Sequence, residues 1–202
     1  MLTLFHSPGS CSDGILFLLE ELEADFQVSI VDLRSAMQKE PAFLALNPKG
    51  KVPALRRQDG QVISEFQSIA FWLARTQAGG RLWPDDIDLQ TRTLEALDFI
   101  IASVHMRGFT FYRVPQKFQL DEAGTQDLRA YGKGEFESGL LHLSRMLGDK
   151  EYLLGAFGLA DAAAFYILQW AEKGQFELPD NLIALAARLN ARPAAQRVLS
   201  PA

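Results

Sequence analysis

The chain has 202 residues, a formal net charge of −5 and one cysteine, Cys11, so no intrachain disulfide can form and a secreted disulfide scaffold is excluded. Its 48 % hydrophobic and 22 % charged residues are typical of a chain that folds around a core, and its acidic balance disfavours nucleic-acid binding, which depends on basic side chains. The residues Met1 to Pro8 include no basic stretch, and no segment offers about 18 uncharged apolar residues, so we expect a cytoplasmic protein with neither signal peptide nor membrane span.

The chain opens with a strand–helix–strand pattern. The short apolar run 2–5 predicts a strand, and the segment 27–31 predicts a second one. Between them, apolar residues recur at helical spacing at Ile15, Leu18, Leu19 and Leu22. A helix that connects two strands in this way predicts that the strands are parallel.

A hairpin and a third helix follow. The segment 41–46 predicts a short helix, and 47–53 has the composition of a loop. Asp59-Gly60 lies between two β-type runs, 54–57 and 61–64, which is a strong hairpin signal. The order β-α-β-α-β-β-α therefore covers residues 1–78, and the Gly, Pro and Asp content of 79–88 predicts a linker.

The remaining residues, 89–202, show helical spacing and no strand pattern, which predicts an all-helical second domain. Within it, Asp161 directly precedes an apolar run, 162–170, and is placed to accept hydrogen bonds from first-turn amides. The fold class is therefore an α/β domain followed by an all-α domain.

Three motifs resemble the cytosolic glutathione transferases, and the bacterial beta class in particular. The segment 7–12 places a cysteine at the start of the first helix, as that class does. The segment Asn-Pro-Lys-Gly-Lys-Val-Pro at 47–53 is similar to the loop before the family's cis-proline. The segment 158–162 resembles its folding motif, with Gly158 in place of the usual Ser or Thr. The resemblance implies a thioredoxin-like first domain.

The same resemblance implies the partners. Glutathione would be the co-substrate and a small hydrophobic electrophile the second substrate. A homodimer is expected, with an isologous interface. No metal, nucleic acid or membrane is expected to take part.

The catalytic candidates lie around the first turn. Cys11 begins the first predicted helix, where amide groups and the helix dipole favour an anion, so we expect its thiol pKa to fall. It could hydrogen-bond the glutathione thiolate, form a mixed disulfide with glutathione, or be an ordinary buried residue. Ser12 and Ser10 are hydroxyl alternatives, although Ser12 could simply cap the helix. His6 replaces the tyrosine of the beta class, and could be a base near neutral pH or a hydrogen-bonded strand end.

The loop 47–53 supplies the next candidates, Lys51, Val52 and Pro53. The resemblance implies a cis peptide bond before Pro53, with the Val52 backbone turned outward to pair with the cysteinyl part of glutathione. A plain turn before a strand is the alternative.

Further candidates for binding glutathione come from the resemblance alone. Glu65 would pair with the ammonium group of the γ-glutamyl end, or be an ordinary first-turn acid. Phe66 replaces the family's serine, so only its N–H remains for the ligand carboxylate. Gln38 and Lys39 stand where related enzymes hold the glycine carboxylate.

In the helical half, His105 corresponds to a histidine that lines the second-substrate site, with Met106 replacing the family's lysine. Asp98 lies seven residues earlier, about two turns away on the same helix face, where the family reaches across a dimer interface to glutathione. Both could belong to an ordinary polar helix face. We expect an aromatic cluster to line a cleft for the electrophile, formed by Phe109, Phe111, Tyr112 and Phe118. Ser103 and Arg113 are further candidates for binding a substrate.

Three functions remain open at this point. The first is transfer of glutathione to a hydrophobic electrophile. The second is reduction of disulfides by Cys11 with glutathione, a monothiol mechanism because the sequence contains no Cys-x-x-Cys. The third is non-enzymatic binding on the same fold, which the departures at Phe66 and Met106 keep open.

Overall fold

The computed structural model describes residues 1–77, 79 and 81–200. The chain divides into two compact units, one formed by Met1–Asp85 together with the segment from Arg188 onward, and one formed by Asp86–Ala187. The end of the chain thus packs with its beginning, whereas the sequence led us to expect residues 89–202 together. Ala78, the last residue of the predicted first domain, and Gly80, in the predicted linker, lie outside the described residues.

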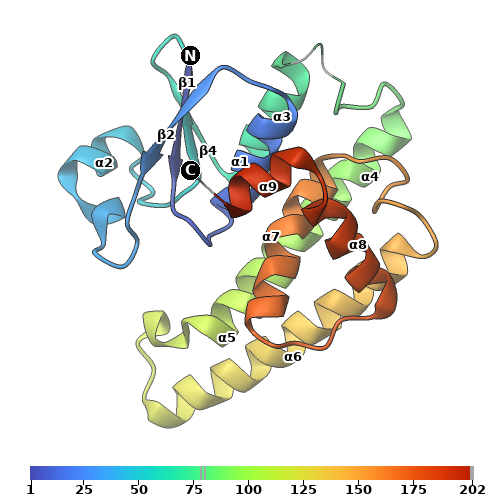
Figure 1. Cartoon of the computed structure of the whole chain (residues 1–202). Helices are drawn as coiled ribbons and strands as arrows, with labels where there is room; N and C mark the ends of the chain where they lie inside the picture. The colour runs from blue at the N-terminus through green and yellow to red at the C-terminus, as the bar shows by residue number, and fades with distance from the viewer. Residues whose placement is uncertain (78, 80, 201–202) are drawn as a thin grey trace. The chain divides into compact units, whose positions relative to one another are not determined.

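The first unit contains a mixed four-stranded sheet (Figure 1). Its strands are β1 (Leu2–His6), β2 (Phe26–Ile30), β3 (Ala54–Arg56) and β4 (Val62–Ser64), in the order β2-β1-β3-β4. β1 and β2 are parallel and β3 is antiparallel to both β1 and β4, which confirms the predicted strand–helix–strand unit and the hairpin. β1 is buried along its whole length, because helices cover both faces of the sheet.

The helices of the first unit are α1 (Ser12–Glu21), the 3-10 turn η1 (Met37–Lys39), α2 (Pro41–Leu46), α3 (Phe66–Thr76) and α9 (Pro193–Leu199). α2 packs on β1 through Phe43, whose ring meets that of Phe5 edge to face at 5.8 Å. α1 and α3 lie on the opposite face of the sheet (Figure 1). α9 packs against α1, where Arg192 Nε donates to Glu21 Oε2 at 3.0 Å.

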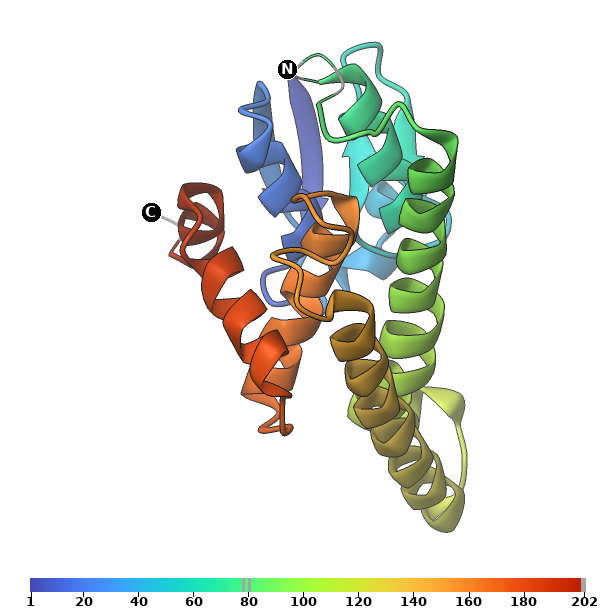
Figure 2. The ribbon, with the colours of Figure 1, turned by 90° about the vertical axis from the view of Figure 1, so that its right-hand side faces the viewer.

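The second unit is helical, as predicted. Its elements are α4 (Ile87–Asp98), η3 (Phe99–Thr110), α5 (Phe111–Arg113), η4 (Pro115–Phe118), α6 (Glu122–Leu147), α7 (Leu159–Lys173) and the greater part of α8 (Asp180–Asn190), whose last residues, from Arg188, belong to the first unit. Apart from isolated bridges near Tyr152, its described residues form no strand. Figure 2 shows α6 running beside the helix formed by α4 and η3. No helix among the described residues has the length and apolarity needed to cross a bilayer.

Glycine lets α6 approach its neighbours closely. A Cβ on Gly132 would lie 2.4 Å from the Tyr112 backbone nitrogen and 2.6 Å from Phe111 Cβ. A Cβ on Gly139 would lie 2.9 Å from the side chain of Val104. The packing of α6 against η3 and α5 therefore depends on the absence of side chains at these positions.

Asp161 fastens the start of α7. Its Oδ2 accepts from the Gly158 N–H and its Oδ1 from the Leu153 N–H, both at 2.9 Å. The sequence predicted acceptance from the helix's first-turn amides, and these two bonds come from other amides. The carboxylate instead binds the amide that precedes the helix and an amide of the preceding loop, so it ties that loop to α7.

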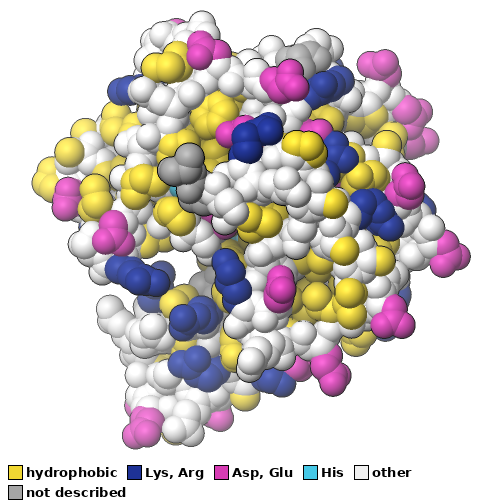
Figure 3. Space-filling view, in the orientation of Figure 1, with side chains coloured by type: hydrophobic (Ala, Val, Ile, Leu, Met, Phe, Trp, Pro, Cys, Tyr) yellow, Lys and Arg dark blue, Asp and Glu magenta, His cyan; other side chains and the backbone are white. Residues whose placement is uncertain are grey.

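The surface carries both signs of charge. Acidic and basic side chains are spread among apolar ones over the face in Figure 3. This mixed distribution fits the modest net charge of −5.

Candidate active site

The turn between β1 and α1 is organised by the Ser12 hydroxyl. Ser12 Oγ lies 2.8 Å from His6 Nδ1 and 2.7 Å from Ser10 Oγ, and it accepts from the Ser7 N–H at 3.1 Å. Ser12 is 0 % exposed, whereas Ser10 is only half-buried. The result is a hydrogen-bonded chain that runs from the buried His6 through Ser12 to the accessible Ser10.

Ser12 does not cap α1, in contrast to one of our expectations. Cys11 occupies the cap position, without a side-chain cap bond, and Ser12 is the first helical residue. The Ser10 hydroxyl instead accepts from the Ser12 N–H at 3.2 Å. The capping function therefore belongs to Ser10, and Ser12 is committed to the buried chain.

His6 is not a base near neutral pH, which corrects a second expectation. The ring is 4 % exposed, and burial lowers the pKa of His6 to about 4. Its Nε2 lies 3.8 Å from Asp13 Oδ1, a residue that our sequence reasoning did not single out, and both Asp13 oxygens lie 3.1 Å from the Gly9 nitrogen. At neutral pH the imidazole is uncharged and serves as a hydrogen-bond partner of Ser12.

The Cys11 thiol also differs from expectation. Loss of hydration on burial, followed by the negative charge of Asp13, raises the pKa of Cys11 to about 12. Its Sγ donates to the Val52 carbonyl oxygen at 3.6 Å, a bond that only the protonated thiol can make. The predicted fall in pKa is therefore wrong, because desolvation outweighs the favourable end of the helix. Cys11 is a neutral thiol at physiological pH.

The predicted cis peptide bond between Val52 and Pro53 is confirmed. The loop before it is closed by Asn47, whose Nδ2 donates to the Lys51 carbonyl at 2.8 Å. The Lys51 side chain is exposed, and its charge acts on Cys11 by favouring the thiolate weakly. The structure thus brings Cys11, Lys51, Val52 and Pro53 together.

Gly50 brings Gln38 and Lys39 to the same loop. It has a φ of +60°, and a Cβ there would lie 2.9 Å from Lys39 Nζ and 3.0 Å from the Gln38 carbonyl oxygen. Gln38 Oε1 is buried and accepts no hydrogen bond from the described residues. Gln38 and Lys39 therefore stand beside the loop 47–53 with one acceptor unused.

Glu65 stands at the amino end of α3 in a rare backbone conformation, with a φ of +73°. Its Oε1 lies 2.7 Å from Lys49 Nζ, and both side chains are exposed. Sequence reasoning missed Lys49, although it belongs to the segment Asn-Pro-Lys-Gly-Lys-Val-Pro at 47–53. Phe66 points into the core at 5 % exposure, so only its backbone is available.

In the second unit, His105 lies among aromatic rings of α7. Its Nδ1 is 3.4 Å from the Tyr166 hydroxyl, and its ring centroid is 4.8 Å from that of Trp170. Phe109 stacks on the same Trp170 ring at 4.4 Å. Sequence reasoning read Tyr166 and Trp170 only as part of an apolar run, since helical spacing alone does not show which rings face a site.

η3 is a π-helix over twelve residues, which no sequence pattern indicated. π-helical turns are wider than α-helical ones and are frequent at functional sites. The expectation that Asp98 and His105 share a face assumed α-helical turns, and it is wrong because η3 begins at Phe99. Asp98 is exposed at the end of α4, whereas His105 packs against α7.

The predicted aromatic cluster is divided. Phe109 and Tyr112 are neighbours at 6.1 Å, and Tyr112 meets Phe176 at 5.1 Å. Phe111 instead pairs with Phe118 at 5.0 Å. Of the other two candidates, Ser103 is half-buried on η3 and Arg113 is exposed. Among the described residues, no group of three or more His, Cys, Asp or Glu side chains is placed to hold a metal ion.

The β2-β1-β3-β4 sheet, with a cysteine at the start of α1 and a cis-proline opposite it, defines a thioredoxin-like domain followed by a helical unit. The pattern of the glutathione S-transferase N-terminal domain matches residues 9–76. Glutathione S-transferase GstA of Escherichia coli O157:H7 is 30 % identical over 98 % of this chain and 96 % of its own length. The chain therefore belongs to the glutathione S-transferase family.

Solved structures agree with this assignment. A glutathione transferase homologue from Sulfitobacter, with bound glutathione, is 25 % identical, has a TM-score of 0.91, and is matched over 98 % of this chain and 97 % of its own. The bacterial beta class glutathione S-transferase of Sphingomonas chungbukensis is 28 % identical with a TM-score of 0.84, matched over 98 % and 96 %. The resemblance to the beta class is thereby confirmed.

Proposed function

We propose that this protein conjugates the glutathione thiolate to small hydrophobic electrophiles. The observation that carries the proposal is the hydrogen-bonded chain of Ser10, Ser12 and His6 at the same turn as Cys11, whose Sγ donates to the Val52 carbonyl. Such a chain holds neutral donors in fixed positions, which is how a site stabilises a sulfur anion without reorganising. The glutathione complex of the Sulfitobacter homologue supports the choice of ligand.

Glutathione would lie along the loop 47–53. The Val52 backbone pairs with its cysteinyl part, as an extended peptide adds to a strand edge. Glu65 takes the ammonium group in exchange for Lys49, and the Phe66 N–H receives the γ-glutamyl carboxylate. At the glycine end, Lys39 and Lys51 supply positive charge and the unused Gln38 Oε1 accepts an N–H of the ligand.

The sulfur would be stabilised by hydrogen bonds from uncharged groups. The Ser10 proton is available to the sulfur when the Ser12 hydroxyl is the donor in the Ser12–Ser10 bond, since the Ser10 oxygen then accepts from both the Ser12 hydroxyl and the Ser12 N–H. Cys11, with a pKa of about 12, keeps its proton, and its S–H would turn from the Val52 carbonyl to the sulfur to become a second donor. Hydrogen bonds to an anion are about twice as strong as neutral ones, so these donors lower the pKa of the glutathione thiol, whose proton leaves to solvent. Ser12 and His6 position Ser10.

The electrophile would bind in the helical unit. His105, Phe109 and Trp170 present stacked and edge-on rings that suit a flat apolar substrate. We further propose a homodimer, in which Asp98 reaches the partner's glutathione, as the family resemblance implies. Exposure of Asp98 at the end of α4 supports that role.

The test is turnover of a chlorodinitrobenzene-type substrate together with the ultraviolet absorbance of bound glutathione thiolate. Ser10→Ala should raise the pKa of bound glutathione by about one unit and lower kcat/KM by about tenfold at neutral pH. Cys11→Ala should have a smaller effect, because a thiol is a weaker hydrogen-bond donor than the Ser10 hydroxyl that remains. No turnover with any of a wide panel of electrophiles, by protein that binds glutathione, would contradict the proposal and favour a binding protein.

Disulfide reduction through Cys11 is the alternative that this experiment must separate. A mixed disulfide requires the Cys11 thiolate, and a thiol with a pKa of about 12 supplies almost none at neutral pH. We therefore expect no glutathione adduct at Cys11 after incubation with oxidised glutathione, measured by mass spectrometry. Disulfide reductase activity that Cys11→Ala abolishes, with conjugation retained, would assign the protein to the second function.

A further inference from the structure

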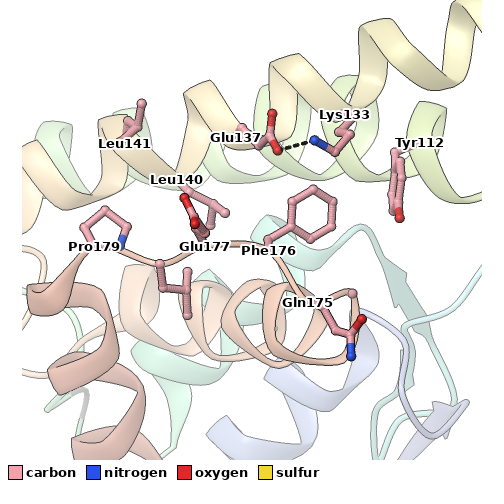
Figure 4. A pocket seen from close by; sticks show the side chains of 11 residues that line it. Tyr112, Lys133, Glu137, Leu140, Leu141, Gln175, Phe176, Glu177 and Pro179 are labelled. Atoms are coloured by element: carbon pink, nitrogen blue, oxygen red, sulfur yellow. Dashed lines mark hydrogen bonds and ion pairs between the residues drawn. The ribbon is translucent and has the colours of Figure 1, made fainter.

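A cavity of about 600 Å³ lies in the second unit, between α6 and the segment 174–179 that joins α7 to α8 (Figure 4). Pockets that hold small organic molecules span about 300–1,000 Å³. None of the candidates for binding glutathione lines this cavity, and of the electrophile-site candidates only Tyr112 does. The cavity is therefore distinct from the candidate glutathione site, and it shares only Tyr112 with the candidate electrophile site.

The cavity has a firm aromatic wall. The rings of Tyr112 and Phe176 meet edge to face at 5.1 Å, and Phe176 in turn packs on Phe136 at 4.8 Å. The Phe176 N–H donates to the Ala171 carbonyl at 2.9 Å, and a Cβ on Gly174 would lie 2.7 Å from the Phe176 ring. The carboxyl end of α7 therefore holds Phe176 in place. The other apolar residues that line the cavity are Leu140, Leu141, Leu178 and Pro179.

The charged lining is acidic. Lys133 Nζ lies 2.6 Å from Glu137 Oε1, so these two charges compensate each other (Figure 4). Glu177 also lines the cavity and forms no ion pair with the described residues. The nearby Arg129 does not line the cavity, and it donates to the Tyr112 carbonyl at 2.8 Å. One carboxylate, on an exposed side chain at the wall, therefore remains uncompensated.

We propose that this cavity binds a small organic cation with a flat apolar body. Its ammonium group lies at Glu177, and its body lies against Tyr112 and Phe176. The cation complements the uncompensated carboxylate, and aromatic faces attract positive charge by a cation–π contribution. The volume admits a ring system of the size of a naphthalene and leaves room for the charged substituent.

A series of contacts between aromatic rings links the cavity to His105. Tyr112 contacts Phe109, Phe109 stacks on Trp170 at 4.4 Å, and Trp170 meets His105 at 4.8 Å. A ligand against Tyr112 therefore alters the surroundings of Trp170. The indole N–H resonance of Trp170 is a reporter within the second unit that needs no glutathione and no catalytic turnover.

Three matched probes test the proposal: 1-naphthylmethylammonium, 1-naphthylmethanol and 1-naphthoate, titrated by calorimetry and by amide NMR spectra. We expect the cation to bind about fivefold more tightly than the neutral alcohol, the size of one exposed charge contact with a cation–π contribution. Naphthoate should bind most weakly. Amide resonances of residues 174–179 and the Trp170 indole resonance should shift with the cation.

Two variants separate the site from non-specific attraction. Glu177→Gln should reduce the preference for the cation over the alcohol to about one. Glu172→Gln makes the same charge change on the nearby exposed end of α7, outside the cavity, and should leave the preference intact. Naphthoate binding as tightly as the cation, an unchanged preference in Glu177→Gln, or unmoved resonances at 174–179 would each overturn the proposal. Because glutathione is absent throughout, these outcomes do not depend on the proposed transferase activity.

Discussion

Gly132 and Gly134 lie two residues apart on α6 and offer a matched test of the packing described above. A Cβ on Gly132 would lie 2.4 Å from the Tyr112 nitrogen and 2.8 Å from the Gly108 carbonyl oxygen, and both are backbone atoms that cannot rotate away. A Cβ on Gly134 would meet nothing within 4 Å. The same substitution, glycine to alanine, therefore enters a closed contact at one position and open space at the other.

The magnitudes follow from two opposing contributions. Alanine gains about 1 kcal/mol over glycine in a helix interior, at both positions. Overpacking against fixed atoms costs about 1–3 kcal/mol, and the contacts at Gly132 place it at the upper end. We expect Gly132→Ala to lower the free energy of unfolding by about 2 kcal/mol and Gly134→Ala to raise it by about 1 kcal/mol. The gap of about 3 kcal/mol corresponds to about 6–12 °C in Tm.

The assay is urea unfolding of both variants and the parent, followed by far-ultraviolet circular dichroism, with Tm measured in parallel. If the parent and the two variants have the same m value, the difference between them lies in the free energy of unfolding and not in the compactness of the unfolded state. Equal shifts of the two variants in the same direction would refute the reasoning. The contact between α6 and the helix formed by η3 and α5 would then not be as close as the structure has it.

Three further predictions concern single side chains. The pKa of His6 falls from 6.5 to about 4 on folding, so between these pH values the unfolded chain binds a proton that the folded chain does not. The free energy of unfolding should therefore decline by about 3 kcal/mol as the pH falls through that window. Urea unfolding of His6→Asn should show a flatter decline with pH, and the same pH dependence in the parent and the variant would contradict this. The ultraviolet titration of the sole thiol, Cys11, should show no thiolate step below the ordinary cysteine range, and a step near neutral pH would refute the raised pKa. Asp161→Ala should cost about 3 kcal/mol in unfolding free energy, because two amides lose a charged acceptor that is 1 % exposed; a loss below about 1 kcal/mol would show that other groups replace it.

The order of strands and helices in the first unit could be predicted because each element has a local signature. The apolar run at 2–5, the Asp-Gly turn at 59–60 and the helical spacing from Ile15 depend on near neighbours only. The cis bond at Pro53 came from a motif rather than from spacing. These features are fixed by the local chain, and the tertiary structure leaves them as they are.

The chemistry of the site could not be predicted, because it depends on how deeply each group is buried. The position of Cys11 at a helix start indicated a low pKa, but loss of hydration and the charge of Asp13 reverse the shift. The same burial makes His6 a neutral partner instead of a base. The width of η3 and the rings of α7 around His105 arise from packing between distant segments, for which the sequence has no short-range signal.

The attachment of α9 to α1 has a consequence for how the chain folds during translation. Arg192 binds Glu21 and Arg197 binds Glu20. The residues that pack α9 on α1 are therefore synthesised after the whole of the second unit, 86–187. Domains generally fold as units while the ribosome delivers them, and here the inserted helical unit is complete first. The first unit therefore completes its fold only after the segment that begins at Arg188 has been synthesised.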